Sequence, residues 1–175
     1  GSNPARIPAG QNMAGFRLLP KEEDNGRALV KSLSPEQAAK AVIDWVGPDF
    51  IDLNFGCPVN KVVSRNGGSS LLKDCPLLKK VAASVVSAAG PVSVTAKIRI
   101  GWDSKTINAT ETARILEGEG IQRLAVHGRT KEQGYTGQAD WEVISAVVSA
   151  VRIPVIGNGD LDSPTIALAR WRESG

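Results

Sequence analysis

Cysteine is scarce in this chain, and its scarcity narrows the choice of function. Only two cysteines, Cys57 and Cys75, occur among 175 residues. They fall on different predicted elements and lack the close spacing of metal ligands, so we expect neither a disulfide framework nor a metal site. Two isolated thiols suit a reducing compartment, and we expect a cytoplasmic protein.

Long apolar runs and leader-like segments are also lacking. No stretch is apolar for long enough to span a bilayer, and the first residues do not show the basic, apolar and small-residue succession of a signal peptide. We therefore expect no membrane partner. The net charge of +3 and the isoelectric point near 9.0 permit an anionic partner without requiring one.

Strand and helix patterns alternate along most of the chain. Short apolar strands are predicted at residues 28–33, 50–55, 92–100, 124–127 and 153–157. The first helix signal is Ser34-Pro35-Glu36-Gln37, which combines an N-cap, a proline at the first helical position and a capping-box glutamine. Strands joined by helical crossovers form a parallel sheet, so we predict an α/β fold of (β/α)8 TIM-barrel type, with about five clear βα units. A doubly wound open sheet is the structural alternative.

The strand that begins at Phe50 carries the first chemical signal. Apolar Ile51 and Leu53 alternate with polar Asp52 and Asn54, which is the period of a strand with one polar face. Gly56 and Pro58 then end the strand and leave Cys57 at its carboxyl end. A cysteine at this edge is a candidate catalytic group, although a free buried cysteine is the simpler interpretation when it stands alone.

Three later strands end in polar residues as well. Lys97 and Arg99 lie two residues apart on one strand, so both side chains share one face. Two cations on an inward face need an anionic partner, although Arg99 could also pair with Asp52. The only histidine, His127, ends the next strand and is followed by Arg129. The last strand ends in the turn Gly157-Asn158-Gly159-Asp160, whose N–H groups could bind a phosphate.

Taken together, these motifs resemble the tRNA-dihydrouridine synthases in order and approximate spacing. The shared motifs are Asp52-Leu53-Asn54-Phe55-Gly56-Cys57-Pro58, Gly67-Gly68-Ser69-Ser70-Leu71-Leu72, Lys97-Ile98-Arg99-Ile100-Gly101, His127-Gly128-Arg129-Thr130 with Tyr135, Ala139-Asp140-Trp141 and Gly157-Asn158-Gly159-Asp160. The resemblance runs from about residue 28 to residue 170. It implies a flavin-dependent (β/α)8 barrel, an oxidoreductase that uses FMN and NADPH to reduce uridines of tRNA to dihydrouridine.

The resemblance also implies a role for each site residue. Cys57 would donate a proton to C5 of the uracil, a role that suits a thiol because its ordinary pKa of about 8.5 leaves it protonated at neutral pH. Asn54 would meet a base edge, and Arg99 and Arg129 would border the substrate. The residues implied for the cofactor are Lys97 at the flavin ring, His127 at the ribityl or phosphate end, and Asn158, Gly159 and Asp160 at the phosphate.

Departures from the family pattern leave other functions open. Asn12-Met13-Ala14-Gly15 runs straight into Phe16-Arg17, so we interpret residues 1–26 as an irregular, degenerate first-strand region and residues 27–175 as a partial flavin-binding barrel. We expect an eighth strand and a C-terminal helical tRNA-binding domain to be absent, self-association through open barrel edges, and poor FMN binding without activity on tRNA for the chain alone. The alternatives are a non-catalytic remnant or fragment that binds RNA or protein, and another FMN barrel similar to dihydroorotate dehydrogenase.

Overall fold

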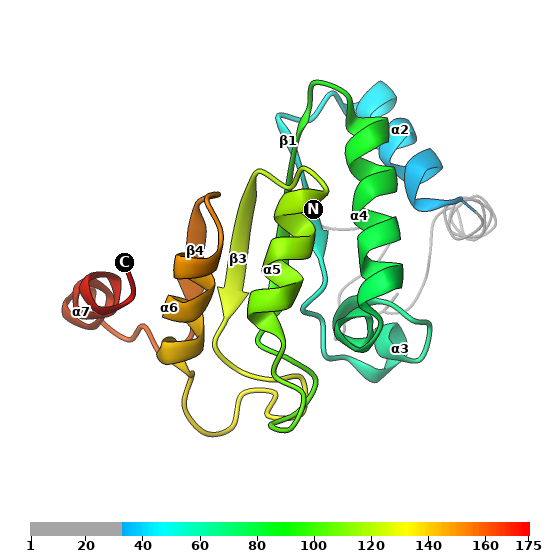
Figure 1. Ribbon diagram of the computed structural model, residues 1–175. Helices are drawn as coiled ribbons and strands as arrows, with labels where there is room; N and C mark the ends of the chain where they lie inside the picture. The colour runs from blue at the N-terminus through cyan, green and yellow to red at the C-terminus, as the bar shows by residue number, and fades with distance from the viewer. Residues whose placement is uncertain (1–32) are drawn as a thin grey trace, which may run out of the picture.

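The computed structural model describes residues 33–175, which form a parallel sheet covered by helices (Figure 1). The irregular segment predicted for residues 1–26 and the strand predicted for 28–33 lie outside the described residues, apart from Leu33, which is not in a strand. The strands of the described sheet lie in sequence order, and all pair in parallel. They are β1 (Phe50–Asn54), β2 (Ser93–Arg99), β3 (Arg123–His127) and β4 (Val155–Asn158).

Helices connect successive strands, and most begin where the sequence predicts. Ser34 and Gln37 form the expected capping box, and the side chain of Asp74 accepts a hydrogen bond from the Leu77 amide at the start of another helix. Ser163 caps the last helix in the same way. The helical segments are α2 (Pro35–Val46), α3 (Asn60–Val63), the 3₁₀ helix η1 (Gly68–Lys73), α4 (Cys75–Ala89), α5 (Ala109–Gly118), α6 (Trp141–Ala150) and α7 (Pro164–Ser174).

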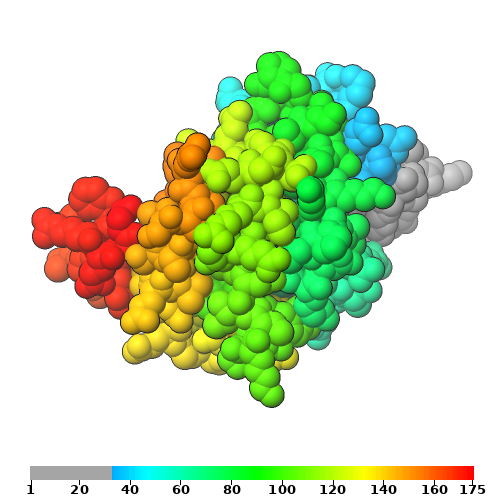
Figure 2. Space-filling view, viewed as in Figure 1, coloured from blue at the N-terminus to red at the C-terminus, as the bar shows by residue number. Residues whose placement is uncertain are grey.

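Strand order and helix placement together establish a barrel-type sheet. In a doubly wound sheet the strand order reverses at one point and helices cover both faces. The order of the four described strands does not reverse, and α4, α5 and α6 lie side by side over one face of the sheet (Figure 1). Their side chains form a continuous outer surface, beyond which α7 stands at one end (Figure 2). The described chain is therefore an open part of a (β/α)8-type barrel, and the doubly wound alternative is wrong.

The hydrophobic core lies between this sheet and its helices. Leu78 of α4 and Leu116 of α5 are fully buried against the outward side chains of the strands, such as Ile98, Leu124 and Val126. Each large side chain removed from water in this way stabilises the fold by about 2 kcal/mol. Because this core holds the strands in place from one side, the opposite face of the sheet can carry polar side chains.

That opposite face corresponds to the inside of a barrel, and parallel register arranges its side chains in rows. Asn54 pairs with Lys97 in the register of the sheet. Two residues further toward the carboxyl ends, Arg99 pairs with His127, and His127 pairs with Asn158. The polar residues predicted at separate strand ends thus lie next to one another. Within residues 33–175, no helix combines the length and apolar character needed to cross a membrane.

Candidate active site at the carboxyl ends of the strands

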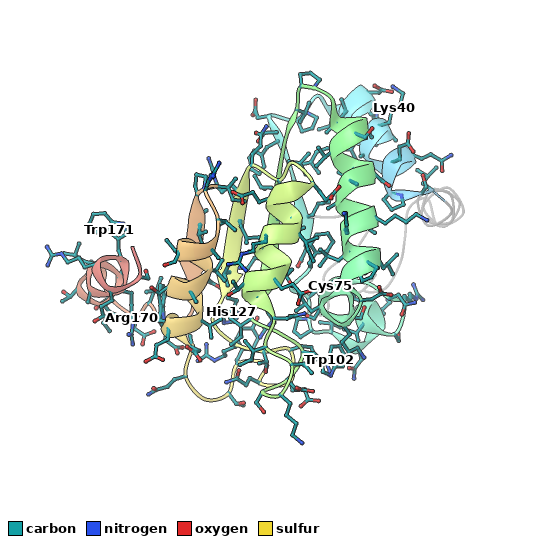
Figure 3. All side chains as sticks on the ribbon, in the orientation of Figure 1. Lys40, Cys75, Trp102, His127, Arg170 and Trp171 are labelled. Carbon is teal, nitrogen blue, oxygen red and sulfur yellow. The ribbon has the colours of Figure 1, made fainter. Side chains whose placement is uncertain are left out.

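A cleft of about 410 Å³ lies at the carboxyl ends of the strands. Six of the predicted site residues line this cleft: Asn54, Cys57, Lys97, Arg99, His127 and Asn158. Figure 3 shows His127 at the carboxyl end of β3 and Trp102 in the loops beyond that end. The remaining three predicted residues are not part of the lining.

The loop that carries Cys57 leaves the sheet just after Phe55, whose amide donates to the Lys97 carbonyl at 2.8 Å. The next amide, that of Gly56, donates to Oδ1 of Asn54 at 3.0 Å. Asn54 therefore stabilises the turn before the cysteine, and its amide nitrogen stays available to a base edge. Cys57 is half-buried and faces the cleft.

Lys97 brings a positive charge into the cleft. Its Nζ lies 3.4 Å from Oδ1 of Asn158, and no carboxylate of the described residues forms a salt bridge with it. The side chain is half-buried. An ammonium held against a neutral amide can stabilise an anionic group placed in the cleft.

Arg99 is buried, and it bridges the loop after β1 and the loop after β3 instead of pairing with Asp52. Its Nε donates to the Gly56 carbonyl at 3.1 Å, and its Nη1 donates to the carbonyls of Thr130 and Gly134 at 2.9 and 2.8 Å. Asp52 accepts a hydrogen bond from Oγ1 of Thr95 at 2.6 Å. The pairing of Arg99 with Asp52, which the sequence left open, is therefore absent.

Arg129 is almost completely buried and is not part of the cleft lining. Its Nη2 donates to the Gly137 carbonyl at 2.7 Å and to Oδ1 of Asp160 at 2.5 Å, and its Nε donates to the Thr136 carbonyl at 3.2 Å. The guanidinium thus ties the loop after β3 to the turn after β4. The contact of Arg129 with the substrate stays a prediction.

Asp160 supports the same turn from the other side. Its Oδ2 accepts from the Ala139 amide at 2.6 Å. This amide and the Arg129 guanidinium hold the pKa of the Asp160 carboxyl below its ordinary value. The carboxylate is therefore ionised and engaged within the protein, so any contact of this turn with a phosphate would use backbone N–H groups.

The turn itself packs closely on its neighbours. Gly159 has a φ of 123°, and a Cβ added there would come within 2.6 Å of the Ala139 side chain. Nε1 of Trp141 donates to the Gly159 carbonyl at 3.1 Å. No described residue accepts a hydrogen bond from the amides of Gly159 or Asp160, which leaves them available to an anion.

His127 is buried among cations, and its ionisation is strongly suppressed. Burial and the charges of Arg99, Arg129 and Lys97 lower its pKa from 6.5 to about 4. The ring is therefore neutral at pH 7 and can both donate and accept a hydrogen bond. Its Nε2 lies 3.4 Å from Nη1 of Arg129.

We expect this histidine to titrate far below the ordinary imidazole range. His127 is the only histidine of the chain, so its ring protons can be followed by NMR without assignment of other imidazoles. The midpoint should lie near pH 4. Because the unfolded chain takes up this proton at about pH 6.5, the folded state should lose stability as the pH falls from there toward 4. A midpoint near pH 6.5 would contradict the buried, cation-surrounded site.

Two features of the site were missed in the sequence. Tyr135 lines the cleft, with its ring centroid 6.2 Å from that of His127 and 5.7 Å from the Arg99 guanidinium, although the sequence assigned it no role. Ser69 contacts the backbone of Cys57. Both residues belong to the quoted motifs, which was the only signal for them.

The groups present fit a flavin. A half-buried ammonium, a neutral imidazole and an asparagine line the cleft, and the turn that follows this asparagine, Asn158, has amides without a partner among the described residues. Together they are a donor set for an electron-rich ring and a phosphate. The described part of the chain holds no group of three or more histidine, cysteine, aspartate or glutamate side chains that could bind a metal.

Comparisons with known proteins identify the family of this chain. The family model described as "Dihydrouridine synthase (Dus)" matches residues 30–175. The chain is 44% identical over 163 residues to tRNA-dihydrouridine synthase B of Pseudomonas aeruginosa, covering 91% of this chain and 49% of that protein. It is 47% identical over 138 residues to tRNA-dihydrouridine synthase B of Pseudomonas putida, covering 79% and 40%.

The chain therefore belongs to the dihydrouridine synthase family. The protein of the same name from Xanthomonas axonopodis pv. citri is similar, with 42% identity over 157 residues that cover 88% of this chain and 47% of the relative. The chain thus spans from about two fifths to about half of the length of these relatives.

Proposed function

We propose that this chain is part of the catalytic domain of a flavin-dependent tRNA-dihydrouridine synthase, which reduces a uridine of tRNA with FMN as cofactor and NADPH as reductant. The observation that supports this most is that one cleft is lined by both a thiol, Cys57, and an ammonium, Lys97, that forms no salt bridge within residues 33–175. Reduction of a uracil 5,6 double bond needs a hydride and a proton. The thiol is the proton donor in this scheme.

FMN, when bound, would supply the hydride for C6 of the uracil. Lys97 would stabilise negative charge on the flavin ring, and neutral His127 would hydrogen-bond toward the ribityl chain or phosphate. Asn158 would orient Lys97, and the free amides of Gly159 and Asp160 would bind the phosphate. In this scheme Arg129 and the Asp160 carboxylate shape the turn without touching the cofactor.

The substrate side of the cleft would be formed by β1 and its loop. Asn54 would hydrogen-bond the uracil edge, Arg99 would hold the loops around the base, and Cys57 would donate its thiol proton to C5. Exposed Lys61 and Arg65 follow Cys57 and suit contact with tRNA phosphates. The protein would act in the cytoplasm, where tRNA and NADPH are found.

In the domain division we propose, residues 1–26 precede the barrel and residues 27–175 form part of it. β1 and β4 end the described sheet, and Ile156 on its inner face is half exposed. Contact between copies through these edges is the self-association that such a sheet favours.

A chimera tests the proposed function. Residues 30–175 would replace the matching segment of tRNA-dihydrouridine synthase B of Pseudomonas aeruginosa. We expect the purified chimera to retain FMN, to be reduced by NADPH and to form dihydrouridine in unmodified tRNA. A folded chimera that binds FMN and accepts electrons but forms no dihydrouridine would refute the proposal. A folded chimera without flavin would instead support a non-catalytic remnant.

A further inference from the structure

The loop that carries Cys57 is held in place by a segment that the mechanism above does not use. The carbonyl of Cys57 accepts two hydrogen bonds from one residue, Ser69: one from its amide at 3.0 Å and one from its Oγ at 2.9 Å. Ser69 is completely buried. Its hydroxyl therefore has no solvent to bind and is committed to the carbonyl of the cysteine.

The residue before Ser69 adds a steric constraint. Gly68 has a φ of 57°, a region that glycine adopts without cost. A Cβ added there would lie 2.6 Å from the Cys57 oxygen and 2.9 Å from the Cys57 Cβ, which is closer than atoms can approach. The backbone of Gly68 thus lies directly against the cysteine.

Few other hydrogen bonds from residues 33–175 hold this loop. The ladder between β1 and β2 ends at the Phe55 amide, and Pro58 has no amide hydrogen to donate. Gly56 is fixed by Asn54 and Arg99. The next residue, Cys57, is held through its carbonyl, and both described donors to this carbonyl belong to Ser69.

We propose that Gly68 and Ser69 are positioning residues that aim the Cys57 thiol into the cleft. The effect of this positioning on the reaction rate rests on the proposed function. The positioning itself can be measured without catalysis. A thiol that donates a proton to carbon must be held within reach of that atom, and a small displacement lowers the rate steeply. Release of the Cys57 carbonyl would let the thiol sample orientations away from the substrate.

Ser70 provides a matched control. It is a serine of the same turn, and its Oγ donates to the Gly67 carbonyl at 2.8 Å without contact to the cysteine. Ser69→Ala and Ser70→Ala therefore each remove one hydroxyl and one bond to a backbone carbonyl. Only the first of these bonds ends on Cys57.

The first readout is the reactivity of the thiol. In the 175-residue chain with Cys75→Ala, Cys57 is the single cysteine, and its alkylation by iodoacetamide can be followed by intact mass. Loss of one hydrogen bond should raise the alkylation rate in Ser69→Ala by about fivefold, whereas Ser70→Ala should match the parent. Gly68→Ala should raise the alkylation rate further than Ser69→Ala does. Its urea midpoint would first show that this variant is folded. Equal rates in Ser69→Ala and Ser70→Ala would overturn the proposal.

The second readout separates positioning from general damage. In the chimera, Ser69→Ala should leave flavin reduction by NADPH unchanged and slow the reoxidation of the reduced flavin by tRNA by about fivefold. A parallel fall in flavin content and flavin reduction would show a merely structural role and would contradict the proposal. If even the parent chimera forms no dihydrouridine while the alkylation rates differ as expected, the positioning stands and the proposed function fails.

Discussion

Cys57→Ala in the chimera should lower dihydrouridine formation by about 100-fold or more while flavin binding and flavin reduction by NADPH stay near the parent values. Removal of a positioned proton donor typically costs about 10² to 10⁴ in rate. The thiol lines the cleft, but nothing in the structure places it in the NADPH half of the reaction. The two half-reactions, followed separately by flavin absorbance, would show whether only the second one fails.

Cys75→Ala is the control for this substitution. Cys75 lies at the start of α4, where Nδ2 of the Asn108 side chain donates to its Sγ at 3.6 Å. Burial raises the pKa of this thiol, so it remains protonated at neutral pH. Product formation that survives Cys57→Ala, or that falls equally in Cys75→Ala, would remove Cys57 from the mechanism.

Lys97→Met should weaken FMN retention or slow flavin reduction by about tenfold to hundredfold. The ammonium is the half-buried cation of the cleft, and methionine keeps the length of the side chain while removing the charge. A charge aimed at a group that becomes negative stabilises it strongly where water is partly excluded. FMN titration and stopped-flow reduction by NADPH measure the two effects.

Lys79→Met provides the comparison for a lysine outside the cleft. Lys79 is exposed on α4 and lies 3.4 Å from Glu119. Such surface pairs contribute about 0 to 1 kcal/mol, and this pair is not near the cleft. Equal flavin affinity and equal reduction rates in Lys97→Met and the parent would refute the proposed role of Lys97.

Features set by short-range patterns were predicted correctly from the sequence. The capping box at Ser34 and Gln37 needs only neighbouring residues, and the alternation of Ile51 and Leu53 with polar residues is a local pattern. Parallel βα units then bring their carboxyl ends together, which predicted the meeting of Cys57 with the other strand ends.

The direction of long side chains could not be predicted in the same way. Arg129 follows His127 by two residues, yet only His127 lines the cleft, because the Arg129 guanidinium bonds Asp160, which lies 31 positions further along the chain. Such partners are known only once β3 and β4 are paired. The short helix α3 was missed for another reason: its N-cap, Val59, makes no side-chain hydrogen bond and gives no starting signal.

The most direct test of the central claim is a single turnover in the absence of oxygen. The chimera would be reduced with NADPH, freed of excess nucleotide and mixed with unmodified tRNA. We predict that the flavin is reoxidised and that each reoxidised flavin yields one dihydrouridine, since both processes transfer two electrons. A reduced flavin that persists in the presence of tRNA, or reoxidation without dihydrouridine, would contradict the assignment of this cleft as a uridine-reducing site.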